Sequence, residues 1–313
     1  MKDLSIVTTL YKSERYIKEF LNRIAAAARS ITENYEIIIV NDGSPDKALE
    51  ISLGFQEIDH RILILDLSRN FGHHNAMMAG IREAKGSLVF LIDSDLEEPP
   101  ETLSQFHLIM SRSTENLDVV YGVQEKRRGD IFERVSGEIF YRVFRALTGL
   151  NQDNNILTCR LMKSEYVAAL KKYNEVDLNI GGVWVHAGFQ QLAAPVNKAR
   201  IRKSTYTLAH KIQTFSNAVT SFSEKPLRFV FYMGIALTTF AALIGSVALV
   251  WQLLTGAAPP GYSSIILAIF FFSGVICLAQ GIVGIYLAKI FIEVKGRPQV
   301  IVKRRYSKEN GDG

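Results

Sequence analysis

Cysteine is scarce in this chain, which has 313 residues. Cys159 and Cys277 are far apart and have no metal-ligand spacing, so the sequence predicts neither a disulfide framework nor a zinc site. Hydrophobic residues make up 48% and charged residues 21%, close to ordinary globular values. This composition excludes a disordered chain, a collagen-like repeat and a disulfide scaffold.

Charge is missing from two long segments, residues 229–254 and 263–288, whereas the chain before residue 229 is rich in it. At ~1.5 Å rise per residue, a helix of either length crosses a ~30 Å hydrocarbon core with some tilt. The alternative is a pair of helices buried in a soluble core, where uncharged runs of this length are rare. The sequence therefore predicts two membrane spans that follow a water-soluble head over residues 1–197.

The residues that flank these segments predict their orientation. The N-terminus lacks the basic-then-apolar layout of a signal peptide. Lys225 and Arg228 precede the first predicted span, and the tail 289–313 is basic, whereas the loop 255–262 has no charge. By the positive-inside rule, the head and both termini are expected in the cytoplasm and the loop outside it. The implied location is a membrane that the chain crosses twice, with the head on its cytoplasmic side.

The segment 198–228 joins the head to the first predicted span. It combines clustered cations with apolar residues at helical spacing, which predicts an amphipathic helix at the membrane surface. An ordinary packed helix with a solvated basic face is the alternative. Because the basic residues bracket the predicted spans, the net charge of +5 favours a lipid partner over nucleic acid.

The head alternates strand-like and helix-like segments. Short apolar, β-branched runs predict strands at 4–10, 36–40, 61–67, 87–92 and 118–123. Helical spacing of apolar residues predicts helices over 14–29 and 74–84. This alternation is typical of an α/β domain with a Rossmann-like, mostly parallel, doubly wound sheet. Ligands of such sheets bind beyond the carboxyl ends of the strands.

Three polar motifs follow predicted strands. In VNDGS (40–44), Asp42 is placed to accept hydrogen bonds from a ligand, although Asp-Gly is also a common turn pair. In SRNFGHHNAMMAG (68–80), Arg69 and either His73 or His74 suit phosphate oxygens, and Gly72 permits close backbone approach. The alternative for the motif that begins at Ser68 is a loop of solvated polar side chains at the start of a helix.

The motif LIDSDLEEPPE (91–101) is the most acidic. Asp93, Asp95, Glu97 and Glu98 lie within six residues and repel one another unless a cation or solvent compensates. Carboxylate oxygens are the ligands that Mg²⁺ and Mn²⁺ prefer, and such an ion would stabilise a leaving diphosphate. An acidic start of a helix, with Pro99 and Pro100 in its first turn, is the alternative.

The ordered set LSIVTTLYKSE, VNDGS, LSRNFGHHNAMMAGI and LIDSDLEEPPE resembles family 2 inverting glycosyltransferases with the GT-A fold. The following VYGVQEKRRGDIFERVSGEIFYRVF, then RLM and two C-terminal apolar segments, narrow the resemblance. The chain is similar to membrane-anchored bacterial polyprenyl-phosphate glycosyltransferases, the kin of dolichyl-phosphate mannose synthase. The resemblance implies a nucleotide-sugar donor, with UDP favoured, a polyprenyl phosphate acceptor, Mg²⁺ or Mn²⁺, and a homo-oligomer such as a tetramer. It also implies a location in the bacterial inner membrane and a role in cell-envelope or O-antigen glycan modification.

The resemblance also implies residue roles. The implied nucleotide-sugar residues are Leu10, Tyr11, Glu14, Asp42, Arg69, Gly72, His73, Asp93 and Ser94. Asp95 would hold the metal, with Glu97 beside it where the family usually has glutamine. The implied acceptor-phosphate residues are Arg127, Arg134, Arg160, Arg202 and Lys203. Asp93, Asp95, Arg127 and Arg160 form the implied catalytic set.

Two positions depart from the family pattern. Thr158 stands where the family has an acidic residue two before the arginine, and Gln124 stands where an arginine is expected. A phosphate monoester with a second pKa near ~6 is already an anion at neutral pH and can attack without a protein base. Alternatively, the acceptor is another lipid-linked saccharide, with Asp153, Glu175 or Asp177 as base. A catalytically inactive nucleotide-sugar scaffold is the remaining hypothesis.

Overall fold

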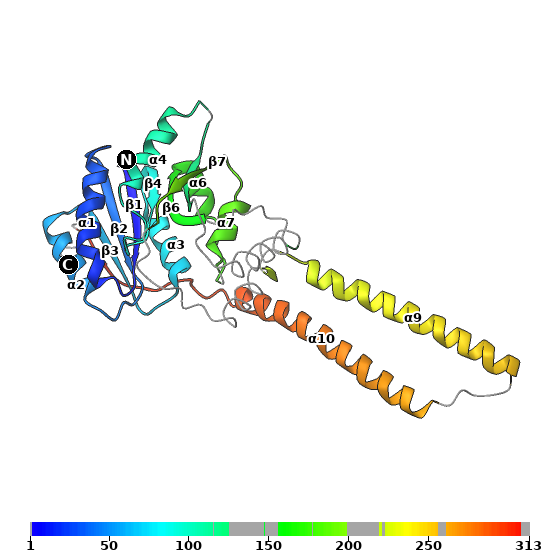
Figure 1. The fold of residues 1–313 in the computed structure, drawn as a ribbon. Coiled ribbons are helices and arrows are strands. Elements are labelled where there is room, and N and C mark those ends of the chain that lie inside the picture. Colours follow the sequence, from blue (N-terminus) through cyan, green and yellow to red (C-terminus); the bar gives the residue numbers. More distant parts are fainter. Residues whose placement is uncertain are drawn as a thin grey trace. The chain divides into compact units, whose positions relative to one another are not determined.

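The computed structural model describes residues 2–114, 116–124, 147, 156–176, 178–198, 219–220, 223–255 and 261–307. These residues form two compact units. The first unit contains an eight-stranded sheet with its covering helices, and the second contains two long helices (Figure 1). Most of the predicted amphipathic segment 198–228 lies outside the described residues.

The sheet has the strand order β7-β5-β6-β4-β1-β2-β3-β8. Its strands are β1 (Lys2–Leu10), β2 (Tyr35–Asn41), β3 (Ile62–Leu67), β4 (Gly86–Leu91), β5 (Val119–Gln124), β6 (Ile156–Lys163), β7 (Gln191–Val196) and β8 (Val302–Tyr306). β4, β1, β2 and β3 run parallel, as do β5 and β7. β6 is antiparallel to both β4 and β5, and β8 is antiparallel to β3. The predicted parallel sheet is therefore the central part of a mixed one.

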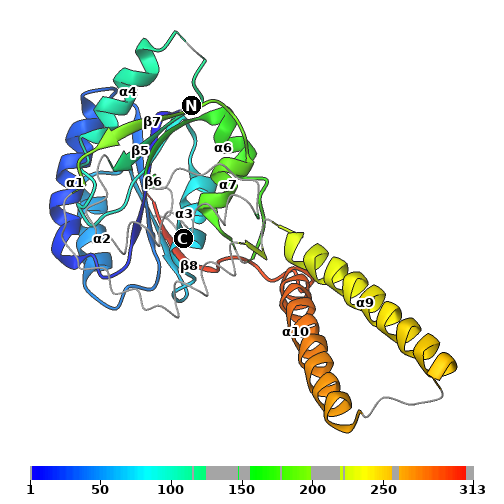
Figure 2. The same cartoon turned by 45° about the vertical axis from the view of Figure 1, so that its right-hand side comes forward.

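Helices cover both faces of this sheet (Figure 2). They are α1 (Glu14–Arg29), α2 (Ala48–Ile58), α3 (His73–Glu83), α4 (Thr102–Arg112), α6 (Ser164–Leu170) and α7 (Ile180–His186). Central strands are buried on both sides, which explains why they are continuous apolar runs rather than alternating ones. On one face α3 lies so close that a side chain at Gly80 would collide with Val7.

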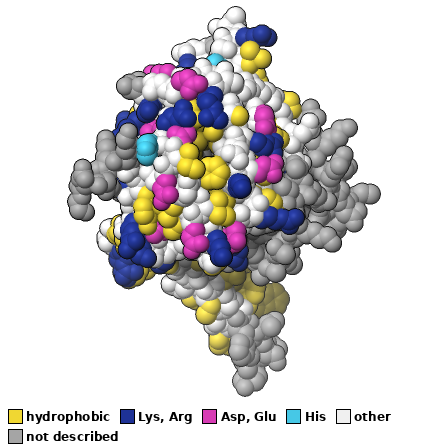
Figure 3. Space-filling view, turned by 90° about the vertical axis from the view of Figure 1, so that its left-hand side faces the viewer, with side chains coloured by type: hydrophobic (Ala, Val, Ile, Leu, Met, Phe, Trp, Pro, Cys, Tyr) yellow, Lys and Arg dark blue, Asp and Glu magenta, His cyan; other side chains and the backbone are white. Residues whose placement is uncertain are grey.

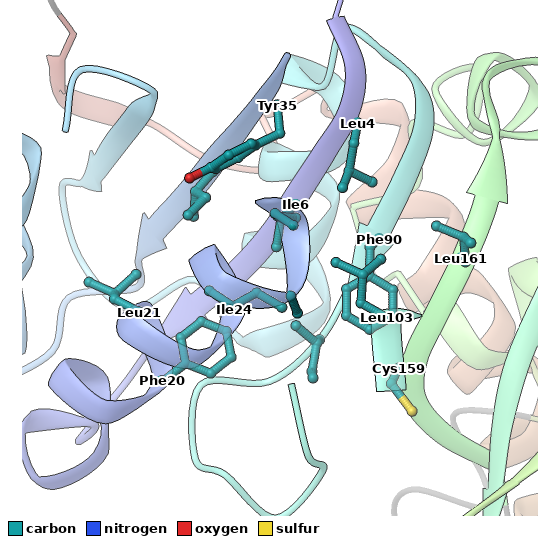
Figure 4. Packing of buried hydrophobic residues seen from close by; sticks show 14 of the residues in the cluster. Leu4, Ile6, Phe20, Leu21, Ile24, Tyr35, Phe90, Leu103, Cys159 and Leu161 are labelled. Atoms are coloured by element: carbon teal, nitrogen blue, oxygen red, sulfur yellow. The ribbon is translucent and has the colours of Figure 1, made fainter. Parts of the chain in front are cut away.

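The main hydrophobic core lies on the opposite face, between the sheet and α1. Apolar residues of α1 recur at helical spacing, and Ile17, Phe20, Leu21 and Ile24 are all fully buried or nearly so. Figure 4 shows Phe20, Leu21 and Ile24 of α1 on one side of Ile6 of β1, and Phe90 and Leu103 of the same core on the other. On the outer side of this unit, acidic and basic side chains are interspersed, as suits a solvated surface (Figure 3).

Strand β8 comes from the segment 289–313, which the sequence predicts to be a basic cytoplasmic tail. β8 pairs with β3 and forms that edge of the sheet, with Ile64 opposite Tyr306. The Ser68 N–H donates to the Ile301 carbonyl at 2.9 Å, and Arg305 forms a 2.9 Å ion pair with Glu83. The physical reason is that an edge strand such as β3 otherwise leaves a row of backbone groups unpaired.

The second unit contains α9 (Lys225–Thr255) and α10 (Tyr262–Val294), which include both segments that the sequence predicts to be membrane spans. Large apolar side chains such as Phe231, Trp251 and Leu287 are exposed along them. Within the part of the chain described, one stretch, Phe271–Val294, is long and apolar enough to cross a membrane. Its mean hydropathy is 2.1, and none of its residues is buried.

Candidate active site

Four loops meet at the carboxyl ends of the parallel strands. They follow β1 (residues 11–13), β2 (42–47), β3 (68–72) and β4 (92–101). Because β1 lies between β2 and β4, the motifs of these loops lie side by side although they are far apart in the sequence. The sequence-based prediction that the polar motifs share one edge of the sheet is consistent with this order.

Asp42 organises the loop that follows β3. Its carboxylate accepts hydrogen bonds from the backbone N–H groups of Phe71, at 2.6 Å, and Gly72, at 3.1 Å. Asn70 Nδ2 donates to the Asp42 carbonyl at 3.1 Å. Asp42 is 2% exposed, so a carboxylate there needs such donors. In this structure Asp42 therefore shapes the loop that carries Arg69, Gly72 and the start of α3.

Gly43 lets the loops after β2 and β3 touch. Its φ is +61°, and a Cβ atom there would lie 2.6 Å from the backbone nitrogen of Asn70. Any other residue would therefore combine backbone strain with a clash against main chain, which cannot rotate away. The glycine of the NDGS motif thus has a packing reason as well as a turn reason.

Ser94 anchors the acidic loop to β1. Its hydroxyl is within hydrogen-bonding distance of two oxygens, the Thr9 carbonyl at 2.7 Å and Ser13 Oγ at 3.0 Å. The side chain is 3% exposed, so Ser94 is a structural link between the two loops in this structure. Its neighbours Asp93 and Asp95 are less buried than Ser94.

His73 and Asp93 form an ion pair, with Nε2 and Oδ1 3.2 Å apart. The other ring nitrogen of His73 lies 3.2 Å from Thr9 Oγ1. Burial disfavours charge on His73, but the carboxylates of Asp93, Asp42 and Asp95 raise its pKa above the ordinary value. Burial likewise disfavours charge on Asp93, but hydrogen bonds from His73 and Thr158 lower its pKa. The pair therefore favours a charged Asp93 at neutral pH.

Thr158 lies opposite Asp93 across the β4–β6 ladder. Leu91 pairs with Arg160 in this antiparallel register, which places Asp93 beside Thr158 two residues further along. The Thr158 side chain hydrogen-bonds to Asp93. A second carboxylate at position 158 would face Asp93 directly, so threonine replaces a repulsion by a hydrogen bond.

Asp95 forms no close ion pair with a residue that the structure describes, although the charge of Lys198 acts on it. Its Oδ1 accepts the Glu97 N–H at 3.0 Å. Burial, together with the charges of Asp93 and Glu97, raises the pKa of Asp95. A cation at this carboxylate would relieve that repulsion. Glu97, in contrast, is paired with Lys198, with Oε2 and Nζ 2.9 Å apart.

Glu98 holds the acidic loop against β6 from inside the domain. It is 2% exposed and accepts the backbone N–H groups of Thr158, at 3.0 Å, and Cys159, at 2.9 Å. Burial and the neighbouring charge of Asp93 raise the pKa of Glu98 to about 7. Its contacts make Glu98 a support for the position of Thr158, and thereby of Asp93.

The remaining residues implied by the resemblance are placed as follows. The side chain of Leu10 is fully buried, whereas Tyr11 is 45% exposed beside it. Glu14 accepts the Lys47 N–H at 3.2 Å, and the guanidinium of Arg69 lies 4.0 Å from the centre of the Phe71 ring. Arg160 is buried on the Asp93 side of β6, over the Trp184 ring, where burial lowers its pKa to about 10.

Four residues implied for the acceptor phosphate lie outside the described residues: Arg127, Arg134, Arg202 and Lys203. Conversely, several residues of the site were not among those that the sequence singled out for it, namely Thr9, Ser13, Glu98 and Lys198. Thr9 and Ser13 flank the first motif, and Glu98 belongs to the acidic one, so their neighbourhood was the available signal. Lys198 belongs to the clustered cations that the sequence places in the segment 198–228, but no local pattern indicates its pairing with Glu97, about a hundred residues earlier.

Replacing His73 with glutamine is expected to change how stability depends on pH. Protonated His73 stabilises the fold below its unfolded pKa of ~6.5, and this contribution is lost as pH rises through the higher folded value. The melting temperature of the wild type should therefore fall relative to that of His73→Gln between about pH 6 and pH 8. Thermal unfolding in detergent measures this, with exposed His60→Gln as the control. Equal pH profiles for all three proteins would contradict a contribution from the His73–Asp93 pair.

The chain is similar to known glycosyltransferases along nearly its whole length. The family model for glycosyl transferase family 2 matches residues 5–170. A Mycobacterium tuberculosis protein named among the glycosyltransferases is 42% identical over 98% of this chain and 89% of its own length. An undecaprenyl-phosphate 4-deoxy-4-formamido-L-arabinose transferase of Photorhabdus laumondii is 26% identical over 97% of this chain and 94% of its own.

A solved structure shares the fold. Glucosyl-3-phosphoglycerate synthase from M. tuberculosis, in complex with Mn²⁺, UDP and phosphoglyceric acid, superimposes with a TM-score of 0.50. It is 14% identical, over 70% of this chain and 76% of the other. The predicted GT-A fold with a mostly parallel central sheet is confirmed. From the family match and the relatives along nearly its whole length, the chain belongs to glycosyl transferase family 2.

Proposed function

We propose that this protein is an inverting glycosyltransferase that moves a sugar from a nucleotide-sugar donor, with UDP favoured, to a polyprenyl phosphate. The observation that carries the proposal is the loop Asp93–Glu98, held by Ser94 and Glu98 at the carboxyl edge of a GT-A sheet. The relatives named as undecaprenyl-phosphate transferases support the acceptor class, because the matched length includes α9 and α10 as well as the sheet.

A divalent cation, Mg²⁺ or Mn²⁺, fits this site through Asp95. In the described part of the chain, no three histidine, cysteine or acidic side chains converge as a metal cage. One or two carboxylates plus substrate phosphates is a common arrangement for such ions. Asp95, which forms no close ion pair with a described residue, would hold the ion, with Glu97 beside it. When bound, the ion would neutralise charge that develops on the leaving nucleoside diphosphate.

The reaction is a single displacement at the anomeric carbon. A phosphate oxygen of the acceptor forms the new bond to that carbon, while its bond to the donor diphosphate breaks. The nucleoside diphosphate leaves with the electron pair, and the configuration inverts. Because the acceptor phosphate is already an anion, no protein base is required, which is consistent with threonine at position 158. His73 and Thr158 orient a charged Asp93 beside the reacting sugar.

The membrane arrangement proposed for the chain is a hairpin of two spans with the catalytic unit in the cytoplasm. The exposed apolar side chains of α9 and α10 support insertion of both helices, and the stretch Phe271–Val294 of α10 is also long and apolar enough to cross a membrane. Strand β8 supports an even number of crossings. It follows α10 in the chain but belongs to the same sheet as the strands that precede α9, so the chain must return to the side it left.

A donor-by-acceptor screen tests this function on the full chain in detergent with Mg²⁺ or Mn²⁺. UDP-, GDP- and dTDP-sugars are each combined with undecaprenyl phosphate or with a lipid-linked saccharide, and products are identified by mass spectrometry. We expect a glycosylated undecaprenyl phosphate, with nucleoside diphosphate released in equal amount. Transfer only to the lipid-linked saccharide would replace the proposed acceptor. Nucleotide-sugar binding without turnover on either acceptor would establish the scaffold alternative instead.

A further inference from the structure

Lys198 joins the acidic loop from a distant part of the chain. It follows the end of β7, and its ammonium group lies 2.9 Å from Oε2 of Glu97. The Glu97 side chain is 15% exposed and that of Lys198 is 32% exposed, so this pair is more sheltered than a surface ion pair. An ion pair in such a setting is screened less than an exposed one.

The other carboxylates of the loop have different partners. Asp93 is paired with His73, Glu98 accepts two backbone N–H groups, and Asp95 accepts one. Glu97 is the carboxylate on which Lys198 acts directly. Burial disfavours charge on Lys198, but Glu97, Glu98 and Asp95 raise its pKa, so the lysine is a cation within this cluster. Its positive charge therefore acts on the same carboxylates that would receive the metal ion.

We propose that Lys198 is an internal counter-ion of the donor site, which competes with the divalent cation for the Glu97 carboxylate. This inference rests on the proposed function for the metal–nucleotide donor, but not on the identity of the sugar or acceptor. Without a nucleotide, a metal ion that uses Glu97 must displace the lysine. A bound diphosphate offers both cations new oxygen partners, so the metal and the nucleotide bind together rather than the metal alone.

The pair also offsets a local excess of negative charge. Glu97 adds a carboxylate to a loop that already holds Asp93, Asp95 and Glu98. Lys198 offsets that charge from the segment that follows β7. Glutamate would be a strong ligand for a divalent ion, and the lysine would limit its occupation until the donor arrives.

Direct Mn²⁺ binding tests the proposal. Free Mn²⁺ is measured by electron paramagnetic resonance during titration of the full chain in detergent, with and without UDP. Lys198→Met should bind Mn²⁺ without UDP roughly fivefold to tenfold more tightly than the wild type, because one partly buried ion pair no longer competes. The gain in Mn²⁺ affinity that UDP produces should shrink in the same variant. Exposed Lys172→Met is the matched control and should stay within about twofold of the wild type.

Two further variants make the outcome decisive. Lys198→Arg keeps the positive charge and should bind Mn²⁺ without UDP nearly as the wild type does, which separates charge from general disturbance of the loop. In a chain that already carries Glu97→Gln, adding Lys198→Met should not change the Mn²⁺ affinity measured without UDP, because the carboxylate for which the two cations compete is gone. Equal Mn²⁺ affinity of Lys198→Met and wild type without UDP would overturn the competition. Normal turnover with no Mn²⁺ binding by any form would instead overturn the metal role in the proposed function.

Discussion

Asp95→Asn is expected to lower the turnover number by about a hundredfold to a thousandfold, which is the usual effect of losing a group that stabilises charge developing in the transition state. Here that charge develops on the leaving diphosphate. Asparagine retains an oxygen that can accept the Glu97 N–H, so the loop should keep its shape. What disappears is the negative charge that would hold the divalent ion at the leaving diphosphate. Release of nucleoside diphosphate under saturating donor and acceptor measures the effect.

The control for Asp95→Asn is Glu57→Gln, which removes an equal charge from the exposed side of α2. Glu57→Gln should leave both the turnover number and the melting temperature unchanged. Asp95→Asn should melt no lower than the wild type, because burial disfavours charge on Asp95. Turnover of Asp95→Asn within about tenfold of the wild type would show that the metal ion does not depend on this carboxylate.

Removing residues 297–313 is expected to lower the melting temperature of the catalytic unit by about 5–15 °C. The deletion removes β8, the Ser68–Ile301 hydrogen bond and the Arg305–Glu83 ion pair. Backbone hydrogen bonds contribute about 1 kcal/mol each, and each kcal/mol shifts the melting temperature of a domain this size by about 2–4 °C. Exposure of the β3 edge should also promote aggregation.

A shorter deletion, of residues 308–313 alone, keeps the whole of β8 and is the matched control. Differential scanning fluorimetry in detergent compares the two truncated chains with the wild type. The longer deletion should also raise the KM for the nucleotide sugar, because Ser68 leads into the loop that carries Arg69 and Gly72. Equal melting temperatures for both deletions would show that β8 contributes little to the sheet.

Much of the sheet could be predicted because its central strands are apolar and β-branched along their whole length. The runs at 36–40 and 87–92 correspond to β2 and β4 within one residue at each end. The helix predicted over 14–29 matches α1, since its apolar face is regular and one side packs on the sheet. Strand β8 could not be predicted, because its sequence VKRRY is mostly basic and its partner is distant in the chain.

Some contacts of the site could likewise be predicted from the sequence, and others could not. Parallel strands place their carboxyl ends at one edge, which brings the acidic and NDGS motifs together from connectivity alone. The pairing of His73 rather than His74 with Asp93 depends on which residue begins α3, and the His74 ring instead contacts the Leu178 carbonyl. Lys198 depends on the pairing of β7 with β5, a non-local contact that no local pattern records.

The position of β8 in the chain also determines the order in which this protein can be assembled during synthesis. Strands β1 to β7 leave the ribosome first, but the sheet lacks its last edge until α9 and α10 have been made. In the proposed membrane arrangement, the two apolar helices therefore meet the membrane insertion machinery while the catalytic unit is still incomplete. Return of the chain to β3 then becomes the final folding step, so that completion of the enzyme follows its anchoring.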